Sequence, residues 1–220
     1  MALSSSASAA RLLHVCAKHR STVYRKPISD HTRRAFMSVL PLLLDRRESR
    51  APCILDSCCG TAQSTLYLAR KHPQSFVLGI DRSHVRLQAA PDLPSNAVVL
   101  RAECADFWRL CAESNIVFVQ HMLWYPNPYP KSEHLVRRWY AHPVFPTLLS
   151  ISHELELRSN MQWYVDDTAT VLKYYDRLPS VQPLPPMNDA EHGAATAFEK
   201  KYGERGESLW QLRCVLQQAT

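Results

Sequence analysis

The chain has 220 residues and is 46% hydrophobic, which is enough to bury one core and makes a single domain the best expectation. Its formal charge of +6 suits an anionic partner. Its seven cysteines contain no C-x-x-C pair, which argues against zinc and disulfide frameworks and for reduced thiols in an intracellular protein. No apolar run is long enough to span a bilayer, so we expect no membrane association.

Residues 1–25 form a basic N-terminal segment with no acidic residue before Asp30. Leaders rich in serine and arginine and poor in acids are typical of organelle transit peptides. The alternative is a disordered tail over residues 1–9 followed by an ordinary basic helix. We expect a cytoplasmic protein, with mitochondrion or plastid as the alternative, and a folded domain over residues 26–220.

Short apolar runs alternate with helix-like stretches along the rest of the chain. The runs that predict buried strands are 53–57, 76–81, 97–103, 116–124, 155–160 and 207–217. Helical spacing occurs over 31–47, where Pro41 predicts a kink or break, and over 62–72, 83–90, 104–113 and 163–178. Residues 179–195 predict a proline-rich loop. This alternation predicts an α/β fold with a parallel sheet covered on both faces.

Three acidic residues end three successive predicted strands: Asp56, Asp81 and Glu103. The carboxyl ends of parallel strands form the ligand crevice of such sheets, and a carboxylate there accepts hydrogen bonds from ribose hydroxyls. Three acids at three strand ends are a stronger signal than any one of them. They predict a cofactor that contains adenosine.

The turn after the first strand has a weaker signal of its own. Only Gly60 is present, because Cys58 and Ala62 stand where a G-x-G-x-G turn has glycines. A single glycine after a strand is most often only a turn. The pattern also lacks the glycines that cradle a pyrophosphate, so the acid-lined turn favours S-adenosylmethionine, which has no phosphate, over NAD.

Alternate prolines at 126, 128 and 130 follow the fourth predicted strand. Proline cannot donate to a sheet ladder and disfavours helix before it, so we expect a stiff extended segment leading into a basic helix with His134, Arg137 and Arg138. The prolines either only end the strand or hold substrate-facing residues. The basic residues either contact phosphate or form a solvated helix face, where Arg137 can pair with Glu133.

Residues 127–138, NPYPKSEHLVRR, resemble the D-P-W-P-K-x-x-H-x-K-R-R signature of the tRNA (guanine-N7)-methyltransferase family. KPISDHTRRAF (26–36) and TAFEKKYGERG (196–206) are similar to further blocks of that family, in family order. The resemblance covers roughly residues 25 to 215. It implies one Rossmann-like class I methyltransferase domain with a mostly parallel, seven-stranded sheet and helices on both faces.

The same resemblance implies S-adenosylmethionine as cofactor and tRNA as partner. It places the cofactor at Asp56, Asp81, Glu103 and Asn127, and the turn after the first strand adds Cys58 and Gly60 as expected cofactor-binding residues. Asn127 is also the catalytic position, between cofactor and base. The substrate side is expected at Lys131, His134, Arg137, Arg138, Asn160, Thr196 and Glu199. Asn127 and Asn160 stand where the family has aspartates.

Methylation at guanine N7 needs no general base, because N7 has a free lone pair, so the enzyme contributes mainly alignment and charge. In this interpretation Glu199 accepts from the guanine N1–H and N2–H groups. Thr196 and Glu199 also match a helix capping box. Two alternatives stay open: the same fold acting on another nucleobase or a small molecule, and a catalytically weak tRNA-binding subunit. A partner protein, and a monomer or homodimer, are equally open.

Overall fold

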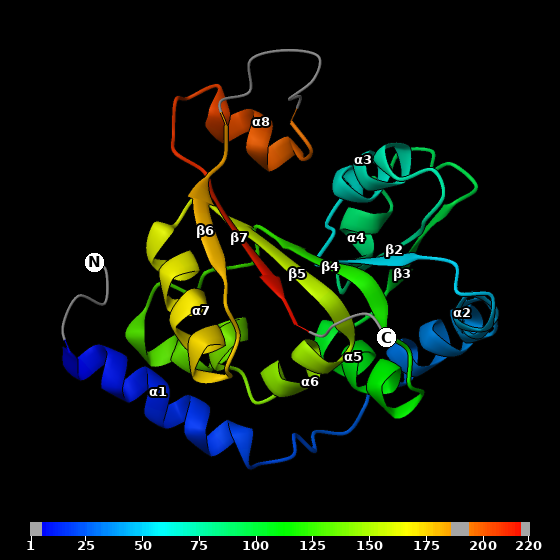
Figure 1. Ribbon diagram of the computed structural model, residues 1–220. Coiled ribbons are helices and arrows are strands. Elements are labelled where there is room, and N and C mark those ends of the chain that lie inside the picture. Colours follow the sequence, from blue (N-terminus) through cyan, green and yellow to red (C-terminus); the bar gives the residue numbers. More distant parts are fainter. Residues whose placement is uncertain (1–5, 186–193, 217–220) are drawn as a thin grey trace.

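A seven-stranded sheet runs through the protein in the order β3-β2-β1-β4-β5-β7-β6 (Figure 1). The computed structural model describes residues 6–185 and 194–216. The strands are β1 Cys53–Ser57, β2 Phe76–Asp81, β3 Ala97–Arg101, β4 Phe118–Trp124, β5 Ser152–Ser159, β6 Ser180–Pro183 and β7 Trp210–Val215. Strand β7 runs antiparallel to both of its neighbours, β5 and β6, and the pairings among β1 to β5 are all parallel. The predicted mostly parallel α/β sheet is confirmed.

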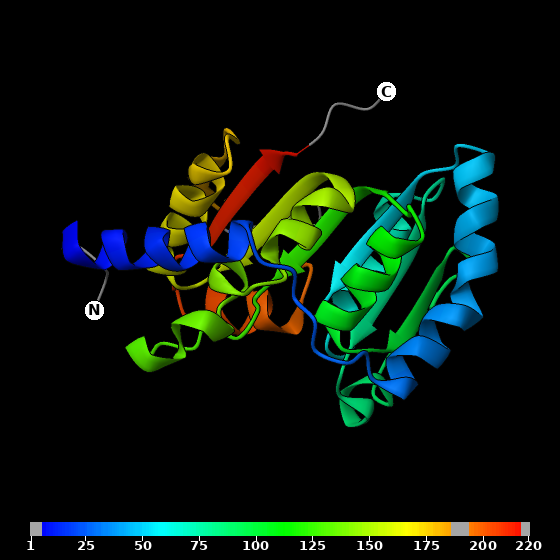
Figure 2. The same cartoon turned by 90° about the horizontal axis from the view of Figure 1, so that it is seen from below.

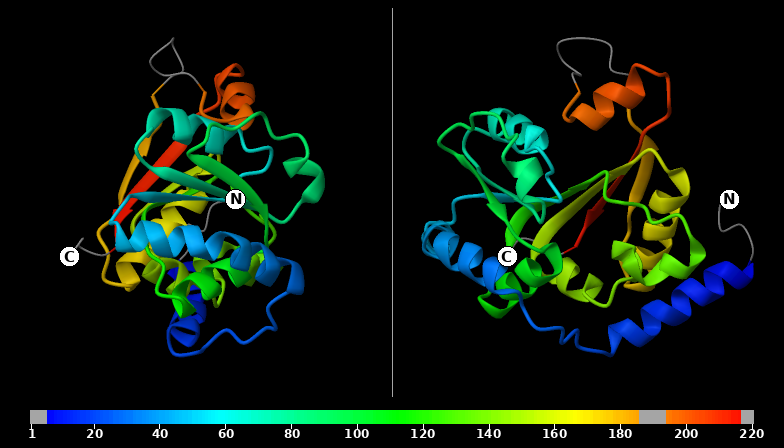
Figure 3. Two further views of the ribbon diagram at one scale, coloured as in Figure 1. Left: turned by 90° about the vertical axis from the view of Figure 1, so that its right-hand side faces the viewer. Right: turned by 180° about the vertical axis from the view of Figure 1, so that it is seen from behind.

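Helices lie on both faces of the sheet (Figures 1 and 2). The α-helices are α1 Ser6–Arg20, α2 Asp30–Glu48, α3 Gln63–Lys71, α4 His84–Leu87, α5 Cys104–Glu113, α6 Phe145–Ser150, α7 Gln162–Tyr174 and α8 Ala197–Gly203; η1 Ser132–Arg137 and η2 Trp139–Ala141 are 3-10 helices. Helices α1, α2, α5, α6 and α7 pack on one face, and α3 and α4 on the other (Figures 2 and 3). None of the helices in the described part of the chain combines the length and apolar character needed to cross a bilayer.

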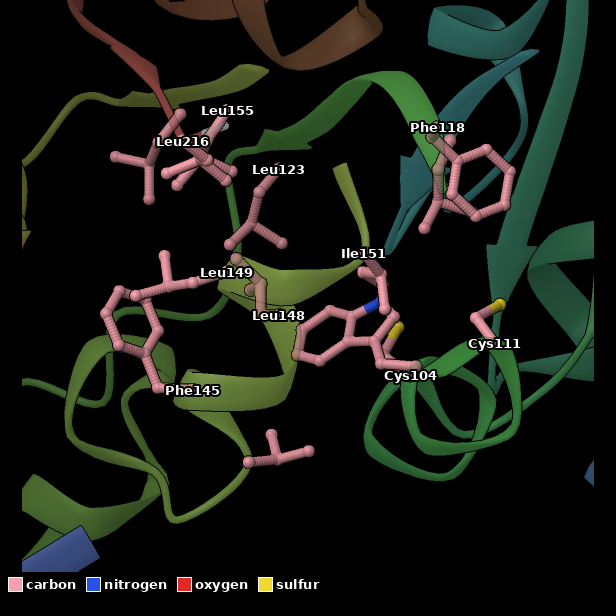
Figure 4. Packing of buried hydrophobic residues seen from close by; sticks show 14 of the residues in the cluster. Cys104, Cys111, Phe118, Leu123, Phe145, Leu148, Leu149, Ile151, Leu155 and Leu216 are labelled. Atoms are coloured by element: carbon pink, nitrogen blue, oxygen red, sulfur yellow. The ribbon is translucent and has the colours of Figure 1, made fainter. Parts of the chain in front are cut away.

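The larger hydrophobic core lies on the face covered by five helices. Side chains of α5 (Cys104 and Cys111), of β4 (Phe118) and of α6 (Phe145) meet there (Figure 4). Residues that point the opposite way, such as Ile54, Val77 and Met122, form a second, smaller cluster with Leu68 of α3. Alternate burial on the two faces is what the period-2 geometry of strands requires.

The sequence predicted helices over both faces of the sheet, but one half of the second face is left uncovered. The strands β4, β5, β6 and β7 line a groove of about 410 Å³ there, bordered by α3 and by no other helix of the described residues. The sequence of β5 explains this, because Leu155 and Leu157 point to the core while Glu154 and Glu156 line the groove. A polar face needs no helix to cover it.

Four local expectations are corrected. Pro41 lies inside a continuous α2, on its exposed side, where water can satisfy the carbonyl that loses its partner. The helix expected over 83–90 is only α4, His84–Leu87. The basic segment after the prolines forms two 3-10 helices in place of one α-helix. The predicted loop over 179–195 contains β6, an edge strand that ends at Pro183 as an edge position allows, while its residues 186–193 lie outside the described residues.

The N-terminal segment takes the helical form, as α1, and packs on the rest of the fold. Leu12 and Cys16 are each 1% exposed and belong to the larger core. His19 Nδ1 lies 3.1 Å from the carbonyl oxygen of Ala141, and Arg20 pairs with Asp176 at 3.3 Å. Residues 1–5 of the expected tail lie outside the described residues. The boundary expected at residue 25 therefore does not separate α1 from the core.

Candidate active site

The turn between β1 and α3 keeps the backbone shape of a glycine-rich turn. Cys58, Gly60 and Ala62 have φ of +62°, +60° and +60°, so each adopts the left-handed conformation. This conformation costs a residue with a Cβ roughly 1–2 kcal/mol. Two non-glycine residues retain it at the positions where a G-x-G-x-G turn has glycines, so the turn is held by its surroundings.

Asp81, at the end of β2, is one of the groups that hold this turn. Its Oδ2 accepts a hydrogen bond from the Gly60 N–H at 3.0 Å, and its Oδ1 accepts from the Ser83 N–H at 2.8 Å. Strands β1 and β2 are neighbours in register, with Ser57 opposite Ile80. The structure thus brings Asp81 and Gly60 together, as the sequence predicted.

Asp56 lies beneath the turn. It is 1% exposed, and its Oδ2 accepts from the hydroxyls of Ser64 and Thr65 at 2.7 Å each. Burial raises the pKa of Asp56 to about 6, and the two hydroxyl donors partly offset that shift. Asp56 therefore anchors the first turn of α3. Its direct contact with the cofactor stays a prediction.

Glu103 lies two residues after β3, at the N-cap position of α5, where its side chain makes no capping hydrogen bond, and it is half-buried. Its N–H donates to the hydroxyl of Thr32, which is fully buried at the start of α2, at 2.9 Å. Ser29 donates to Asp106 of α5 from its N–H at 2.9 Å and from its hydroxyl at 3.0 Å. The block over residues 26–36 therefore fastens α2 to α5 behind the crevice.

The residues of the crevice fit S-adenosylmethionine. A Cβ built on Gly60 meets nothing within 4 Å, so open space lies directly over the turn. By contrast, a Cβ on Gly79 of β2 would lie 2.5 Å from the Thr65 hydroxyl oxygen, so that glycine serves close packing. Carboxylates beside open space suit a cofactor that presents ribose hydroxyls and positive charge.

The proline segment after β4 is less extended than expected. Tyr125 and Tyr129 have φ of +53° and +45°. Asn127 is exposed, and its Oδ1 accepts from the Tyr129 N–H at 3.1 Å. An asparagine side chain that accepts from the backbone two residues on is an Asx turn. Asn127 thus shapes the loop in which it sits, and an aspartate can make the same hydrogen bond.

The basic residues after the prolines divide into two groups. Lys131 and Arg137 are exposed and His134 is half-buried, so all three reach the surface beside the strand ends. Arg138 is 4% exposed; its guanidinium donates to the carbonyls of Tyr129, Pro130 and Lys131 and lies 3.7 Å from Asp167. The phosphate contact expected of Arg138 is wrong, because the side chain turns inward to hold the proline loop.

Glu199, expected to read guanine, already has three partners. Its Oε1 accepts from Arg158 Nη1 at 2.7 Å and from the Tyr125 hydroxyl at 3.0 Å, and its Oε2 accepts from the Ala195 N–H at 2.7 Å. Glu199 is 4% exposed. Thr196 caps α8 by accepting from the Glu199 N–H at 3.0 Å, which is the capping arrangement that the sequence allowed. These contacts bind α8 to the sheet edge.

Arg158 is the residue of this edge that the sequence did not reveal. It is 7% exposed, pairs with Glu156 and Glu199 at 2.7 Å each, and its guanidinium lies 3.7 Å from the ring centre of Trp124. The one signal available was a cation alternating with acids in "ELELR" (154–158). Asn160 follows β5 directly and is half-buried at this same edge.

Comparison with known proteins agrees with this arrangement. Residues 50–212 match a family described as "Putative methyltransferase". The chain is 25% identical over 169 residues to tRNA (guanine-N(7)-)-methyltransferase of Mycobacterium avium, which covers 73% of this chain and 64% of that protein. It is 24% identical over 176 residues to the protein of that name from Chromohalobacter salexigens, covering 74% and 70%. The chain thus spans about two thirds of the length of these relatives.

Solved structures agree in fold. The 16S rRNA (adenine(1408)-N(1))-methyltransferase from Catenulisporales acidiphilia superposes with a TM-score of 0.55 at 15% identity, over 82% of this chain and 94% of that one. An antibiotic-related methyltransferase superposes with a TM-score of 0.52 at 13% identity, over 90% and 96%. The fold agrees with the family match over most of the chain, and that match, together with the curated relatives, shows that the chain belongs, as a divergent member, to the tRNA (guanine-N7)-methyltransferase family.

Proposed function

We propose that the protein transfers a methyl group from S-adenosylmethionine to N7 of a guanine in tRNA. One observation carries the proposal. Strands β1 and β4 are parallel neighbours, with Asp56 opposite Met122, so the glycine-type turn and the proline–lysine segment follow adjacent strand ends. A cofactor crevice and a nucleobase-facing loop at one sheet edge are what methyl transfer to a base requires.

The residues of the crevice have distinct parts in this proposal. Asp81 and Glu103 present carboxylates to the ribose and amino groups of the cofactor, and Gly60 lets the backbone approach it. S-adenosylmethionine, when bound, supplies a methyl group activated by its sulfonium. Guanine N7 has a lone pair and no proton, so the protein needs to hold the base in line and requires no general base. Asn127 provides an amide oxygen after β4, at the position where the family signature that this segment resembles has an aspartate.

Exposed cations around the same edge suit an RNA backbone. Lys131 and Arg137 lie beside the proline loop, and α8, above the ends of β4 and β5, exposes Lys200 and Lys201 (Figures 1 and 3). The turn that follows α8 exposes Arg205. Cations in such positions supply salt-dependent affinity for phosphates. The protein acts as a monomer or homodimer in this proposal. The packing of α1 into the core favours its retention in the folded protein, and with it a cytoplasmic location.

A second candidate is methylation of a different nucleobase on the same fold. The observation that favours it is the engagement of Glu199, whose two carboxylate oxygens accept from Arg158, Tyr125 and Ala195. A buried carboxylate that is already paired has less capacity to accept from guanine N1–H and N2–H.

Transcribed tRNA that contains 7-deazaguanosine in place of guanosine separates the two candidates. Labelled methyl transfer should occur to the ordinary transcript and be lost with the 7-deaza transcript, which lacks the N7 lone pair. Equal transfer to both transcripts would support the second candidate and overturn the first. Titration calorimetry with S-adenosylmethionine alone should show binding, and no binding would reject both.

A further inference from the structure

Two thiols from distant parts of the sequence touch at the cofactor crevice. Cys58, in the β1–α3 turn, and Cys104, the first residue of α5, are 46 residues apart, yet their Sγ atoms lie 3.5 Å from each other. All seven cysteines are among the described residues, and each is a free thiol. The described part of the chain shows no second thiol–thiol contact of this kind.

The two thiols differ in access. Cys58 is half-exposed, whereas Cys104 is 6% exposed and belongs to the larger core (Figure 4). The hydrogen bond with Cys58, together with burial, raises the pKa of the Cys104 thiol well above its ordinary value. A reagent from solvent therefore meets Cys58 first, with Cys104 placed behind it as the second thiol.

Both thiols adjoin residues at which we expect the cofactor to bind. Cys58 lies two residues before Gly60, whose N–H is bound to Asp81, and Cys104 follows Glu103, whose N–H is bound to Thr32. A disulfide requires the sulfurs to approach from 3.5 Å to about 2.05 Å. The bond would tie the turn to the start of α5, and each of these two segments is also held by a hydrogen bond of its own, at Gly60 and at Glu103.

We propose that Cys58 and Cys104 are a thiol-modification site, which forms a reversible disulfide that lowers the affinity of the crevice for its cofactor. With a peroxide as oxidant, Cys58 sulfur attacks one peroxide oxygen, the O–O bond breaks, and a sulfenic acid and water form. The sulfur of Cys104 then attacks Cys58 sulfur, the S–O bond breaks, and a second water leaves. Two thiols are oxidised, the peroxide is reduced to two waters, and a dithiol reductant restores both thiols.

The effect on the cofactor rests on the proposed function, but bond formation does not. The first measurement is therefore chemical. After treatment with hydrogen peroxide and alkylation of remaining thiols, trypsin should release residues 51–70 linked to residues 102–109, which contain Cys104 as their single cysteine. The link should vanish with dithiothreitol and in Cys104→Ser and Cys104→Ala.

Control variants assign the partner in the first peptide. Residues 51–70 also contain Cys53 and Cys59, so the link should persist in Cys53→Ser and in Cys59→Ser and disappear in Cys58→Ser. Cys111→Ser, a buried position on the same helix, should leave the link unchanged. Failure of the link to form in the wild-type protein, or its loss in Cys59→Ser alone, would overturn the proposal.

The second measurement concerns the cofactor. Titration with S-adenosylmethionine should show at least tenfold weaker binding after peroxide treatment of the wild-type protein, and equal affinity before and after treatment of Cys104→Ser. Unchanged affinity of the cross-linked wild-type protein would refute the effect on the crevice. If the reduced protein does not bind the cofactor, the proposed function fails, and the linked peptides alone decide whether the modification site exists.

Discussion

The cofactor half of the strand edge, around β1 to β3, and the substrate half, around β4, β5 and α8, are built on different principles. In the first half the backbone carries the shape, since Cys58 and Ala62 keep the left-handed conformation of absent glycines. In the second half the side chains hold one another, since Glu199 is bound by Arg158 and Tyr125. A backbone site tolerates changes of residue type, whereas a side-chain site changes its chemistry when one neighbour changes.

The largest effect is expected from breaking the buried pair in the substrate half. Arg158→Met should lower the free energy of unfolding by about 3–5 kcal/mol, because Glu199 would remain buried without a cation and the half-buried Glu156 would keep only the exposed Arg213. The matched control is Arg213→Met. Arg213 contacts the same Glu156 at 3.1 Å, but its side chain is 59% exposed, so its loss should change stability by under about 1 kcal/mol. Urea denaturation measures the unfolding free energy of both variants. Equal losses of unfolding free energy would show that the buried Arg158 contributes no more to stability than the exposed Arg213.

In the cofactor half, the pH dependence of stability should reveal Asp56. Its pKa of about 6 lies above the ordinary value of 3.8 because of burial, so its contribution to stability is present below about pH 4 and is lost as pH rises through about 6. Burial lowers the pKa of His121 to about 3, which gives the opposite trend, with stability lost as pH falls below about 6.5.

The difference in unfolding free energy between wild type and Asp56→Asn cancels the contribution of His121. Relative to Asp56→Asn, the wild-type protein should lose about 2–4 kcal/mol of unfolding free energy as the pH rises from 4 to 6.5. A difference that does not vary with pH would mean that Asp56 stays ionised throughout.

Loss of Asp81 should weaken cofactor binding without comparable loss of fold. Asp81→Ala removes the acceptor of the Gly60 N–H and the carboxylate that we propose binds the ribose hydroxyls, and should reduce the free energy of S-adenosylmethionine binding by about 1–3 kcal/mol. Asp92→Ala, at an exposed acid outside the crevice, is the control. Calorimetric titration that gives the same affinity for both variants would remove Asp81 from the cofactor site.

Several of these features follow from the sequence because they are local. The strands over 53–57 and 76–81 and the helix over 104–113 have the predicted bounds, since each is a continuous apolar or periodic run closed by a turn signal. The gathering of the acids at one edge of the sheet could also be predicted, because parallel strands all end at the same edge. The direction of Arg138 and the partners of Glu199 do not follow, since each depends on segments that lie far away in the chain and meet only in the fold.

The phosphate-facing role of the proline segment should appear in the salt dependence of tRNA binding. Arg137→Ala should reduce the slope of log K against log salt by about one unit. The control is Arg47→Ala, which removes an exposed cation in the last turn of α2 and should leave the slope unchanged. A slope that changes equally in both variants would indicate a general effect of charge in place of a contact by η1.

The smallest effect is expected at Asn127. Asn127→Asp keeps an oxygen that accepts from the Tyr129 N–H and adds a negative charge near the cationic methylated base. The rate of methyl transfer should stay near that of the wild-type protein or rise, and Asn160→Asp makes the corresponding change at the end of β5. A large fall in the single-turnover rate of Asn127→Asp would mean that the pocket is built around an amide.

The central claim is that the protein methylates guanine N7 with S-adenosylmethionine, although Asn127 and Asn160 replace the two aspartates of the family signature. Its most direct test is incubation of the full chain with total tRNA and methyl-labelled S-adenosylmethionine, followed by digestion to nucleosides and mass spectrometry. We predict label in 7-methylguanosine. Label in any other nucleoside, or none while S-adenosylmethionine binds, would contradict the claim.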